Sequence, residues 1–396
     1  MTEELAASYR AAWPRLLAHL VRSFGRVELA EDCLQEACLR ALAVEGLADP
    51  VGWISTTARR LVIDELRKEE VRERKAPLLA VGGASTSYDV HGPTTGDDRL
   101  DLLLLACDPL LPSESRMPLA LRFVLGARTE SIADAFLVPH PTMSARLTRA
   151  KRRLDRAGRR LGPPDPQHRG DVLGVISLLY TLGHTALAGE VLGVDGDRAT
   201  ALELARAAVG AWPDEDEAAG LLALLLLTEA RHPGRTDADG RPVTLRDADR
   251  ASWDRAMIGE GLALATKVLP TMGRFALAAG IAGLHSSAPR WEETDWPAVV
   301  RLYDRVIERY PSPGARIARA VASGYGPGGP ESALDELEAL DPGTGATARQ
   351  HAAARADLLR LAGRSLEARA AYLQARALER NAVLRDYLDQ ALAALP

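Results

Sequence analysis

Apolar residues recur at helical spacing along almost the whole chain, and no segment alternates apolar and polar positions as a strand would. Between residues 29 and 42 the apolar positions share one helical face, and charged or amide positions share the other. Asp49 followed by Pro50 predicts the start of a further helix, because Asp caps helices and Pro fits the first helical position. The pattern predicts an all-α protein.

Two stretches interrupt the helical pattern. Residues 76–97 are rich in Gly, Ser, Thr and Pro, and residues 162–166 read Gly-Pro-Pro-Asp-Pro, which are compositions typical of connections. A length of 396 residues allows two or three domains at roughly 150 residues each. We therefore expect a helical domain at 1–75, a linker at 76–97, a second helical domain at 98–161 and a helical extension at 168–396.

The sharpest motif lies at the end of the second predicted domain. A short helix from Thr129 or Glu130, a turn, and a helix restarted by Pro141 describe a helix-turn-helix. Opposite its apolar stripe, the second helix carries polar and basic residues at a spacing of four, three and four: Thr142, Arg146, Arg149 and Arg153. Such a helix is typical of those that enter the DNA major groove; an amphipathic hairpin with a basic exposed face is the alternative.

A second polar surface lies on the helix that begins at Pro50. Aromatic, hydroxyl and guanidinium groups share one of its faces, from Trp53, Thr56, Arg59, Arg60 and Arg67. An aromatic plane offers stacking worth ~1–3 kcal/mol per base and arginines meet phosphates, so this surface suits single-stranded nucleic acid. In the alternative interpretation Trp53 anchors the helix in the core and the arginines only add solubility.

The distribution of charge changes the meaning of the net charge of −5, which by itself argues against nucleic acid. Residues 1–170 hold 25 basic and 23 acidic side chains, and residues 140–170 hold nine basic against two acidic ones. The acidity therefore belongs mostly to the extension, whereas the predicted helix-turn-helix ends in a basic segment.

The remaining chemistry is sparse. Three cysteines cannot form a disulfide framework, and the N-terminal residues do not read as a signal peptide, so we expect a cytoplasmic protein. The longest apolar stretch, residues 218–227, is half a membrane span. No spacing of His, Cys, Ser or acidic residues indicates a catalytic or metal site, so we expect neither an enzyme nor a cofactor nor a bound metal.

Residues 346–380 carry the clearest pattern of the extension, with large and small residues placed as in a tetratricopeptide-type hairpin. Arrays of such hairpins present a concave surface to a peptide or protein partner. The alternative is an intramolecular contact, in which the extension packs against the rest of the chain.

Together, residues 29–42 (LAEDCLQEACLRAL), 49–68 (DPVGWISTTARRLVIDELRK) and 111–154 resemble regions 2 and 4 of extracytoplasmic-function sigma factors of bacterial RNA polymerase. The extension resembles the long tetratricopeptide-like extension of one subgroup of these factors. The resemblance implies an alternative sigma factor that binds core RNA polymerase, recognises the −10 and −35 elements of promoter DNA and promotes melting, with an extension that modulates this activity.

The resemblance also implies roles for particular positions. Residues that dock on the polymerase would be Asp32, Gln35, Glu36 and Arg40. The loop 43–50 and the helix after it, with Trp53, Thr56, Arg59, Arg60 and Arg67, would capture an unstacked base of the −10 element. The −35 element would be read by Thr142, Ser144, Arg146, Arg149 and Arg153. Arg60 stands where many relatives carry Asn, and Ser144 where many carry Lys, which puts base preference there in doubt.

Two other functions fit parts of the sequence. A helix-turn-helix regulator with a ligand- or protein-sensing extension would bind duplex DNA without polymerase. An interaction scaffold would use neither DNA surface.

Overall fold

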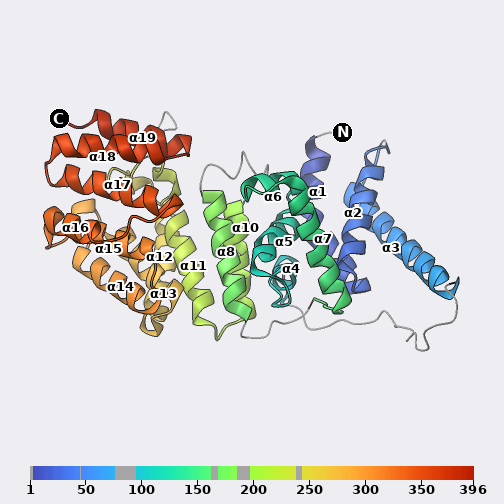
Figure 1. Cartoon of the computed structure of the whole chain (residues 1–396). Helices are drawn as coiled ribbons and strands as arrows, with labels where there is room; N and C mark the ends of the chain where they lie inside the picture. The colour runs from blue at the N-terminus through green and yellow to red at the C-terminus, as the bar shows by residue number, and fades with distance from the viewer. Residues whose placement is uncertain (1–2, 45, 76–94, 162–167, 185–196, 238–242) are drawn as a thin grey trace. The chain divides into compact units, whose positions relative to one another are not determined.

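The computed structural model describes residues 3–44, 46–75, 95–161, 168–184, 197–237 and 243–396. The chain forms two compact units, residues 1–211 and 212–396 (Figure 1). Apart from an isolated bridge at Thr236, the regular elements of the described residues are helices, which confirms the all-α prediction. The predicted breaks at 76–97 and 162–166 lie almost wholly outside the described residues.

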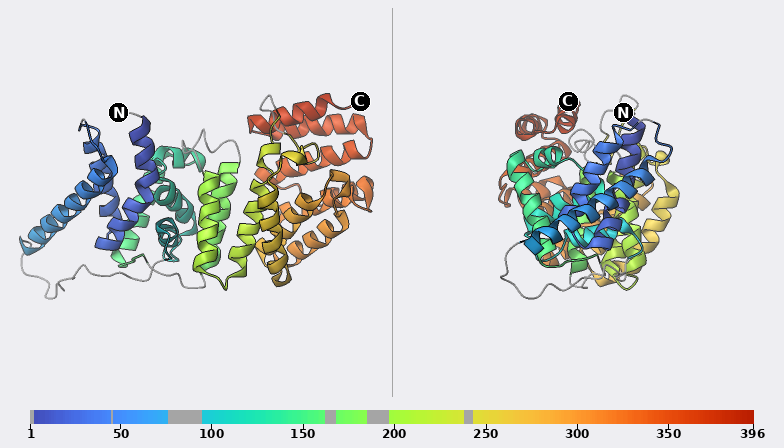
Figure 2. Two further views of the ribbon diagram at one scale, coloured as in Figure 1. Left: turned by 180° about the vertical axis from the view of Figure 1, so that it is seen from behind. Right: turned by 90° about the vertical axis from the view of Figure 1, so that its right-hand side faces the viewer.

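The helices of the first unit are α1 (Glu3–Phe24), α2 (Val27–Ala41), α3 (Pro50–Lys75), α4 (Asp98–Ala106), α5 (Ser113–Leu125), α6 (Thr129–Ala135), α7 (His140–Arg156), α8 (Arg169–His184) and α10 (Asp197–Ala211). The helices α2 and α3 pack together, and α1 contacts both. The C-terminal end of α3 extends beyond these neighbours (Figure 2).

The local sequence explains which face of α2 is buried and where α3 begins. The buried face of α2 includes Ala30, Leu34 and Ala37, at the spacing that one helical face requires. At the start of α3 the backbone N–H of Gly52 donates to the side chain of Asp49 at 2.9 Å, which confirms the predicted cap. Cys33 is buried in α2, whereas Cys38 is half-buried.

The helices α6 and α7 form the predicted helix-turn-helix. Ile132 and Ala133 of α6 are buried, and the stripe of α7, consisting of Met143, Leu147, Ala150 and Leu154, is buried along its whole length. The turn is closed by the N–H of Val138, which donates to the carbonyl oxygen of Ala133 at 2.9 Å.

The helices α8 and α10 pack on each other and contact α4 and α5. Two ion pairs join these helices, each at 2.5 Å: Arg116 of α5 with Asp171 of α8, and Arg99 of α4 with Glu203 of α10. The boundary between the two compact units falls at 211/212. The start of the extension at 168 stays a prediction from the sequence. Among the described helices after residue 168, α8 and α10 belong to the first unit.

The helices of the second unit are α11 (Asp216–Glu229), α12 (Arg255–Val268), α13 (Arg274–Ser287), α14 (Trp296–Arg309), α15 (Pro313–Tyr325), α16 (Gly329–Glu338), α17 (Gly345–Leu361), α18 (Ser365–Leu378) and α19 (Ala382–Ala393). Short 3-10 turns occur between α11 and α14: η2 (His232–Gly234), η3 (Arg250–Ser252), η4 (Leu269–Thr271) and η5 (Trp291–Glu293).

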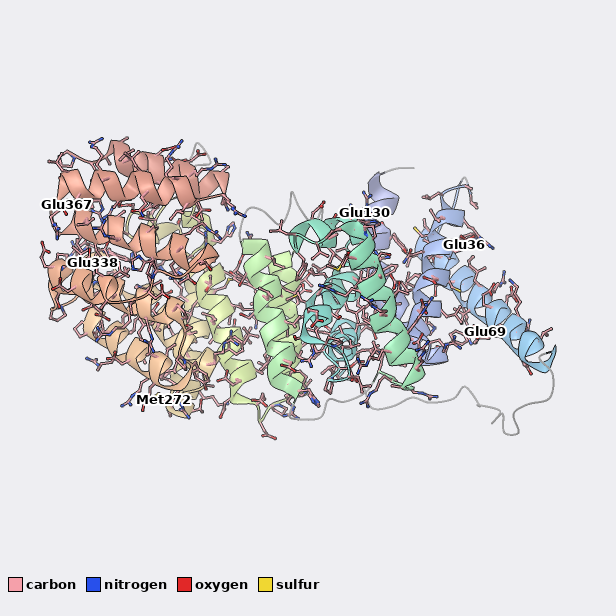
Figure 3. All side chains as sticks on the ribbon, in the orientation of Figure 1. Glu36, Glu69, Glu130, Met272, Glu338 and Glu367 are labelled. Carbon is pink, nitrogen blue, oxygen red and sulfur yellow. The ribbon has the colours of Figure 1, made fainter. Side chains whose placement is uncertain are left out.

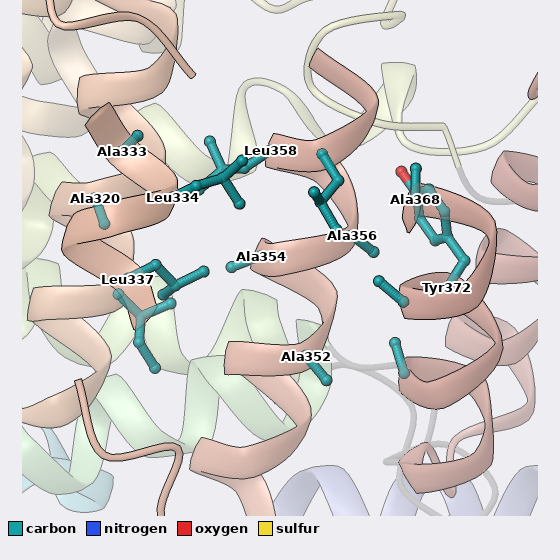
Figure 4. Packing of buried hydrophobic residues seen from close by; sticks show 14 of the residues in the cluster. Ala320, Ala333, Leu334, Leu337, Ala352, Ala354, Ala356, Leu358, Ala368 and Tyr372 are labelled. Carbon is teal, nitrogen blue, oxygen red and sulfur yellow. The ribbon is translucent and has the colours of Figure 1, made fainter. Parts of the chain in front are cut away.

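Successive helices of the second unit pack as neighbours, from α13 through to α19. Figure 4 shows α15 to α18, where leucines of one helix meet alanines of the next. Leu358 of α17 and Tyr372 of α18 are both buried, and Leu358 lies on the side of α17 that faces Leu334 of α16 (Figure 4). Gly363 turns the chain between α17 and α18 with φ of 75°, a conformation that favours glycine.

No helix within the described residues is long and apolar enough to cross a membrane.

Candidate nucleic-acid interface

The polar face of α2 lies open along the outer side of the helix. Asp32, Glu36 and Arg40 are exposed and Gln35 is half-buried, so the structure brings all four predicted docking residues onto one surface. Arg40 pairs with Glu36 at 2.8 Å (Glu36 is labelled in Figure 3). Although the residue is exposed, its carboxyl loses part of its hydration to neighbouring groups, which raises the pKa of Asp32, and the nearby charge of Lys151 only partly offsets this effect.

An apolar patch at the end of α2 escaped the sequence analysis. Leu39 lies between the predicted docking residues and is 62% exposed, and Leu42 and Val44 beyond it are each 41% exposed. Exposed leucines of this kind mark contact surfaces when they cluster. The signal was present in the sequence, because Leu39 falls on the polar side of the helical pattern.

The predicted stripe of α3 is largely exposed. Thr56, Arg59, Arg60 and Arg67 face solvent, and Trp53 is half-buried, so part of its ring surface is accessible. Thr56 donates its hydroxyl to the carbonyl oxygen of Gly52 at 3.0 Å. The structure thus presents an aromatic group and arginines on one side of α3; residue 45 of the preceding loop lies outside the described residues.

A groove of about 680 Å³ runs beside the start of α3. It is lined by Arg15 and His19 of α1, which are exposed, and by Gly52 and Ser55 of α3. Asp49 and Asp98 also line the groove, so Arg15 lies there beside acidic as well as basic groups.

The helix α7 presents Thr142, Arg149 and Arg153 to solvent. Arg146 shares their face but is half-buried, because its Nη1 donates to the carbonyl oxygen of Glu114 at 3.3 Å. Ser144 is also half-buried and lies about 200° around the helix from Thr142. The structure therefore brings the three arginines and Thr142 together and leaves Ser144 apart from them.

The turn before α7 holds a second exposed apolar residue that sequence reasoning missed. Leu137 has φ of 52° and is 85% exposed. A residue with a side chain pays a steric cost in this left-handed conformation, which glycine adopts freely.

A buried acid on α2 was also missed. Glu31 is 1% exposed and forms ion pairs with Arg122 of α5 and Lys151 of α7. Burial alone would raise the pKa of the Glu31 carboxyl, but the charges of Arg122 and Lys151 outweigh burial and hold that pKa below its usual range. Helical spacing could have found it, because Glu31 lies four residues after the buried Val27 and three before the buried Leu34.

No group of three or more His, Cys, Asp or Glu side chains is placed to hold a metal ion within the ranges that the structure describes.

Comparison with known proteins identifies parts of this arrangement. The family described as Sigma-70 region 2 matches residues 9–72, which contain most of α1, all of α2 and most of α3. A family of unknown function, DUF6596, matches residues 169–269, from α8 to the end of α12. No solved structure matches the chain.

Two relatives extend the comparison. The uncharacterized protein R00370 of Rhizobium meliloti (strain 1021) is 36% identical over 399 residues, which cover 96% of this chain and 93% of that protein. The probable ECF RNA polymerase sigma factor SigI of Mycobacterium tuberculosis is 29% identical over 169 residues, which cover 40% of this chain and 58% of that protein. The chain therefore belongs to the same family as R00370, and it contains a sigma-70 region 2 domain.

Proposed function

We propose that this chain is an alternative sigma factor of the extracytoplasmic-function type, which recruits core RNA polymerase to a subset of promoters in the cytoplasm. The observation that carries the proposal is the presence, in one compact unit, of a sigma-70 region 2 domain and a helix-turn-helix with an open basic face. A conventional DNA-binding regulator would need the helix-turn-helix but no region 2 domain.

Each surface has its own task in this proposal. The α2 surface with Asp32, Glu36 and exposed Leu39 docks on the polymerase. The α3 surface captures an unstacked base of the −10 element through Trp53 and the neighbouring arginines. Opening a duplex costs about 1.4 kcal/mol of stacking per step, so capture of the exposed strand is needed to keep it open.

The helix α7 reads the −35 element through its exposed face. Arginines there can reach base edges in the major groove or the phosphates beside it. Arg149 and Arg153 have no ion-pair partner among the described interactions, whereas Arg146 is already bonded to the backbone of α5. Arg149 is therefore the side chain whose replacement tests this role most directly.

The extension modulates the activity of the sigma module. Its successive helical hairpins support a tetratricopeptide-like array, and its helices α8 and α10 contact α5 and α4. The domain division at 1–75, 98–161 and 168–396 remains a prediction from the sequence.

Run-off transcription with purified core polymerase and a cognate promoter tests the proposal. We expect the full chain to direct specific initiation and Arg149→Ala to lower promoter affinity about tenfold. Arg369→Ala is the charge-matched control, because it removes an exposed arginine of α18. Duplex binding without polymerase, combined with no specific initiation, would identify a helix-turn-helix regulator instead.

A further inference from the structure

The helix α18 carries a second apolar face, on the side away from the core of the second unit. Its buried face belongs to the hydrophobic cluster shared with α17 and consists of Ala368, Ala371, Tyr372 and Ala375 (Figure 4). About 180° around the helix from this face lie four exposed apolar residues: Leu366, Ala370, Leu373 and Ala377. We call these four residues the α18 stripe.

The leucines of the α18 stripe are open to solvent. Leu366 is 86% exposed, more than any other large hydrophobic side chain of the described residues, and Leu373 is 52% exposed. Single exposed leucines are common on protein surfaces, but leucines that recur on one helical face mark a contact surface. Because the opposite face of α18 already fills the core, the folding of a single chain does not account for these leucines.

The spacing of the α18 stripe is that of a seam between two helices. Its members are four, three and four residues apart, which is the repeat by which two helices pack along a common line. Large and small residues alternate along the stripe, in the order Leu, Ala, Leu, Ala. A partner helix packs closely only if it offers small residues where this helix offers leucines.

A second copy of α18 meets this requirement. When two copies run antiparallel about a two-fold axis between residues 371 and 372, Leu366 lies opposite Ala377 of the other chain and Leu373 lies opposite Ala370. Each leucine then packs over an alanine, and each contact occurs twice, as in an isologous interface. In a parallel pair leucine would instead meet leucine and alanine would meet alanine, which leaves gaps between the alanines.

Ion pairs beside the α18 stripe are closed within each chain. Glu367, which is labelled in Figure 3, pairs with Arg364 at 2.6 Å, and Arg376 pairs with Asp389 of α19. Because these four charges are neutralised in the single chain, a second copy does not have to supply opposite charges to them. The surface therefore favours an identical apolar helix over a strongly charged partner.

We propose that the second unit forms a weak two-fold dimer, in which the α18 stripes of two chains pack antiparallel. This interface goes beyond the proposed function, because the second unit contains none of the residues predicted to contact polymerase or DNA. A standard interface uses about 20–30 residues a side, many more than the stripe supplies, so the dimer forms only at micromolar or higher concentration of the chain. Dimerisation is therefore concentration-dependent.

Sedimentation equilibrium of the full chain, from about 1 to 300 μM, measures the dimer. Leu373→Lys places a charge opposite an alanine of the other chain and should weaken dimerisation at least tenfold. Leu378→Lys is the matched control, because Leu378 is 41% exposed on the same helix but lies about a third of a turn away from the α18 stripe. The control should leave the Kd within twofold of wild type, and both variants should keep the wild-type melting temperature.

A mixture of two variants tests the antiparallel register. Ala370→Glu, like Leu373→Lys, should by itself weaken dimerisation at least tenfold. In an equal mixture of the two variants, the new lysine of one chain lies opposite the new glutamate of the other, and the second pair of facing positions keeps its native leucine and alanine. The mixture should therefore dimerise at least threefold more tightly than either variant alone.

Three outcomes would overturn the proposal. The first is a wild-type chain that stays monomeric over the whole concentration range, and the second is a dimer that Leu373→Lys leaves intact. The third is a dimer that both stripe variants weaken but that the mixture does not restore, because this result contradicts the antiparallel register. None of these measurements involves polymerase or DNA, so they neither depend on the proposed function nor test it.

Discussion

Protonation of His285 should destabilise the second unit in mildly acidic solution. The imidazole lies on α13, stacked on the Trp291 ring at 5.9 Å and edge-on to Trp296 at 5.4 Å. Its Nδ1 is buried without a hydrogen-bond partner. Burial, reinforced by the charges of Arg231 and Arg250, lowers the pKa of His285 from 6.5 to about 4.

The magnitude follows from proton linkage. The unfolded chain protonates this ring near pH 6.5, whereas the folded chain stays neutral down to about pH 4. Because the pKa of His285 is lower in the folded state, the neutral ring imposes no loss of unfolding free energy above pH 6.5. As the pH falls below 6.5, the unfolded chain binds a proton that the folded chain does not, and the unfolding free energy decreases. Each pKa unit corresponds to about 1.4 kcal/mol, so between pH 7.5 and pH 5 the second unit should lose about 2 kcal/mol of unfolding free energy.

Urea unfolding of the full chain at the two pH values, followed by near-UV circular dichroism, measures this loss. His285→Phe keeps a ring between the two tryptophans and cannot be protonated, so its loss should be smaller than that of the wild type by about 2 kcal/mol. His19→Asn, which changes an exposed histidine of the first unit, controls for the substitution itself. An equal pH dependence in wild type and His285→Phe would refute the reasoning.

Two further predictions concern backbone positions. Leu137→Gly relieves a left-handed residue and loses no buried area, so we expect a gain of about 0.5–1 kcal/mol in thermal unfolding; a lower melting temperature would contradict this. Gly220→Ala places a Cβ 2.8 Å from the backbone of α13, so overpacking of about 1–3 kcal/mol should outweigh the gain in helix propensity. Gly259→Ala, on a helix face with open space, should instead stabilise by about 0.5–1 kcal/mol, and equal effects of the two substitutions would contradict the prediction.

Helical elements and local motifs could be predicted because their signals are local. The cap formed by Asp49 and the buried stripe of α7 depend on residues within a few positions of one another. The same holds for the hairpin of α17 and α18, where Gly363 marks the turn. These signals established the fold class and the helix-turn-helix before any tertiary contact was known.

Long-range pairing could not be predicted in the same way. Glu31 has the spacing of the buried face of α2, but nothing local identifies the cations that neutralise it, Arg122 and Lys151, roughly 90 and 120 residues further along. The boundary between the two compact units at 211/212 also depends on long-range contacts. A Pro-rich break at 162–166 indicates a connection, but only the contacts of α8 and α10 with α4 and α5 show which unit the next helices join.

The net charge of −5 does not show which acidic side chains pair with which basic ones. The carboxylates that meet the cations of α7 come from α2, inside the sigma module, whereas acidic residues of α8 and α10 pair with arginines of α4 and α5. Lys151 and Arg152 of α7 are paired in this way, whereas Arg149 and Arg153 on its exposed face have no ion-pair partner among the described interactions. The total number of basic residues on α7 therefore overstates the charge that is available to DNA phosphates.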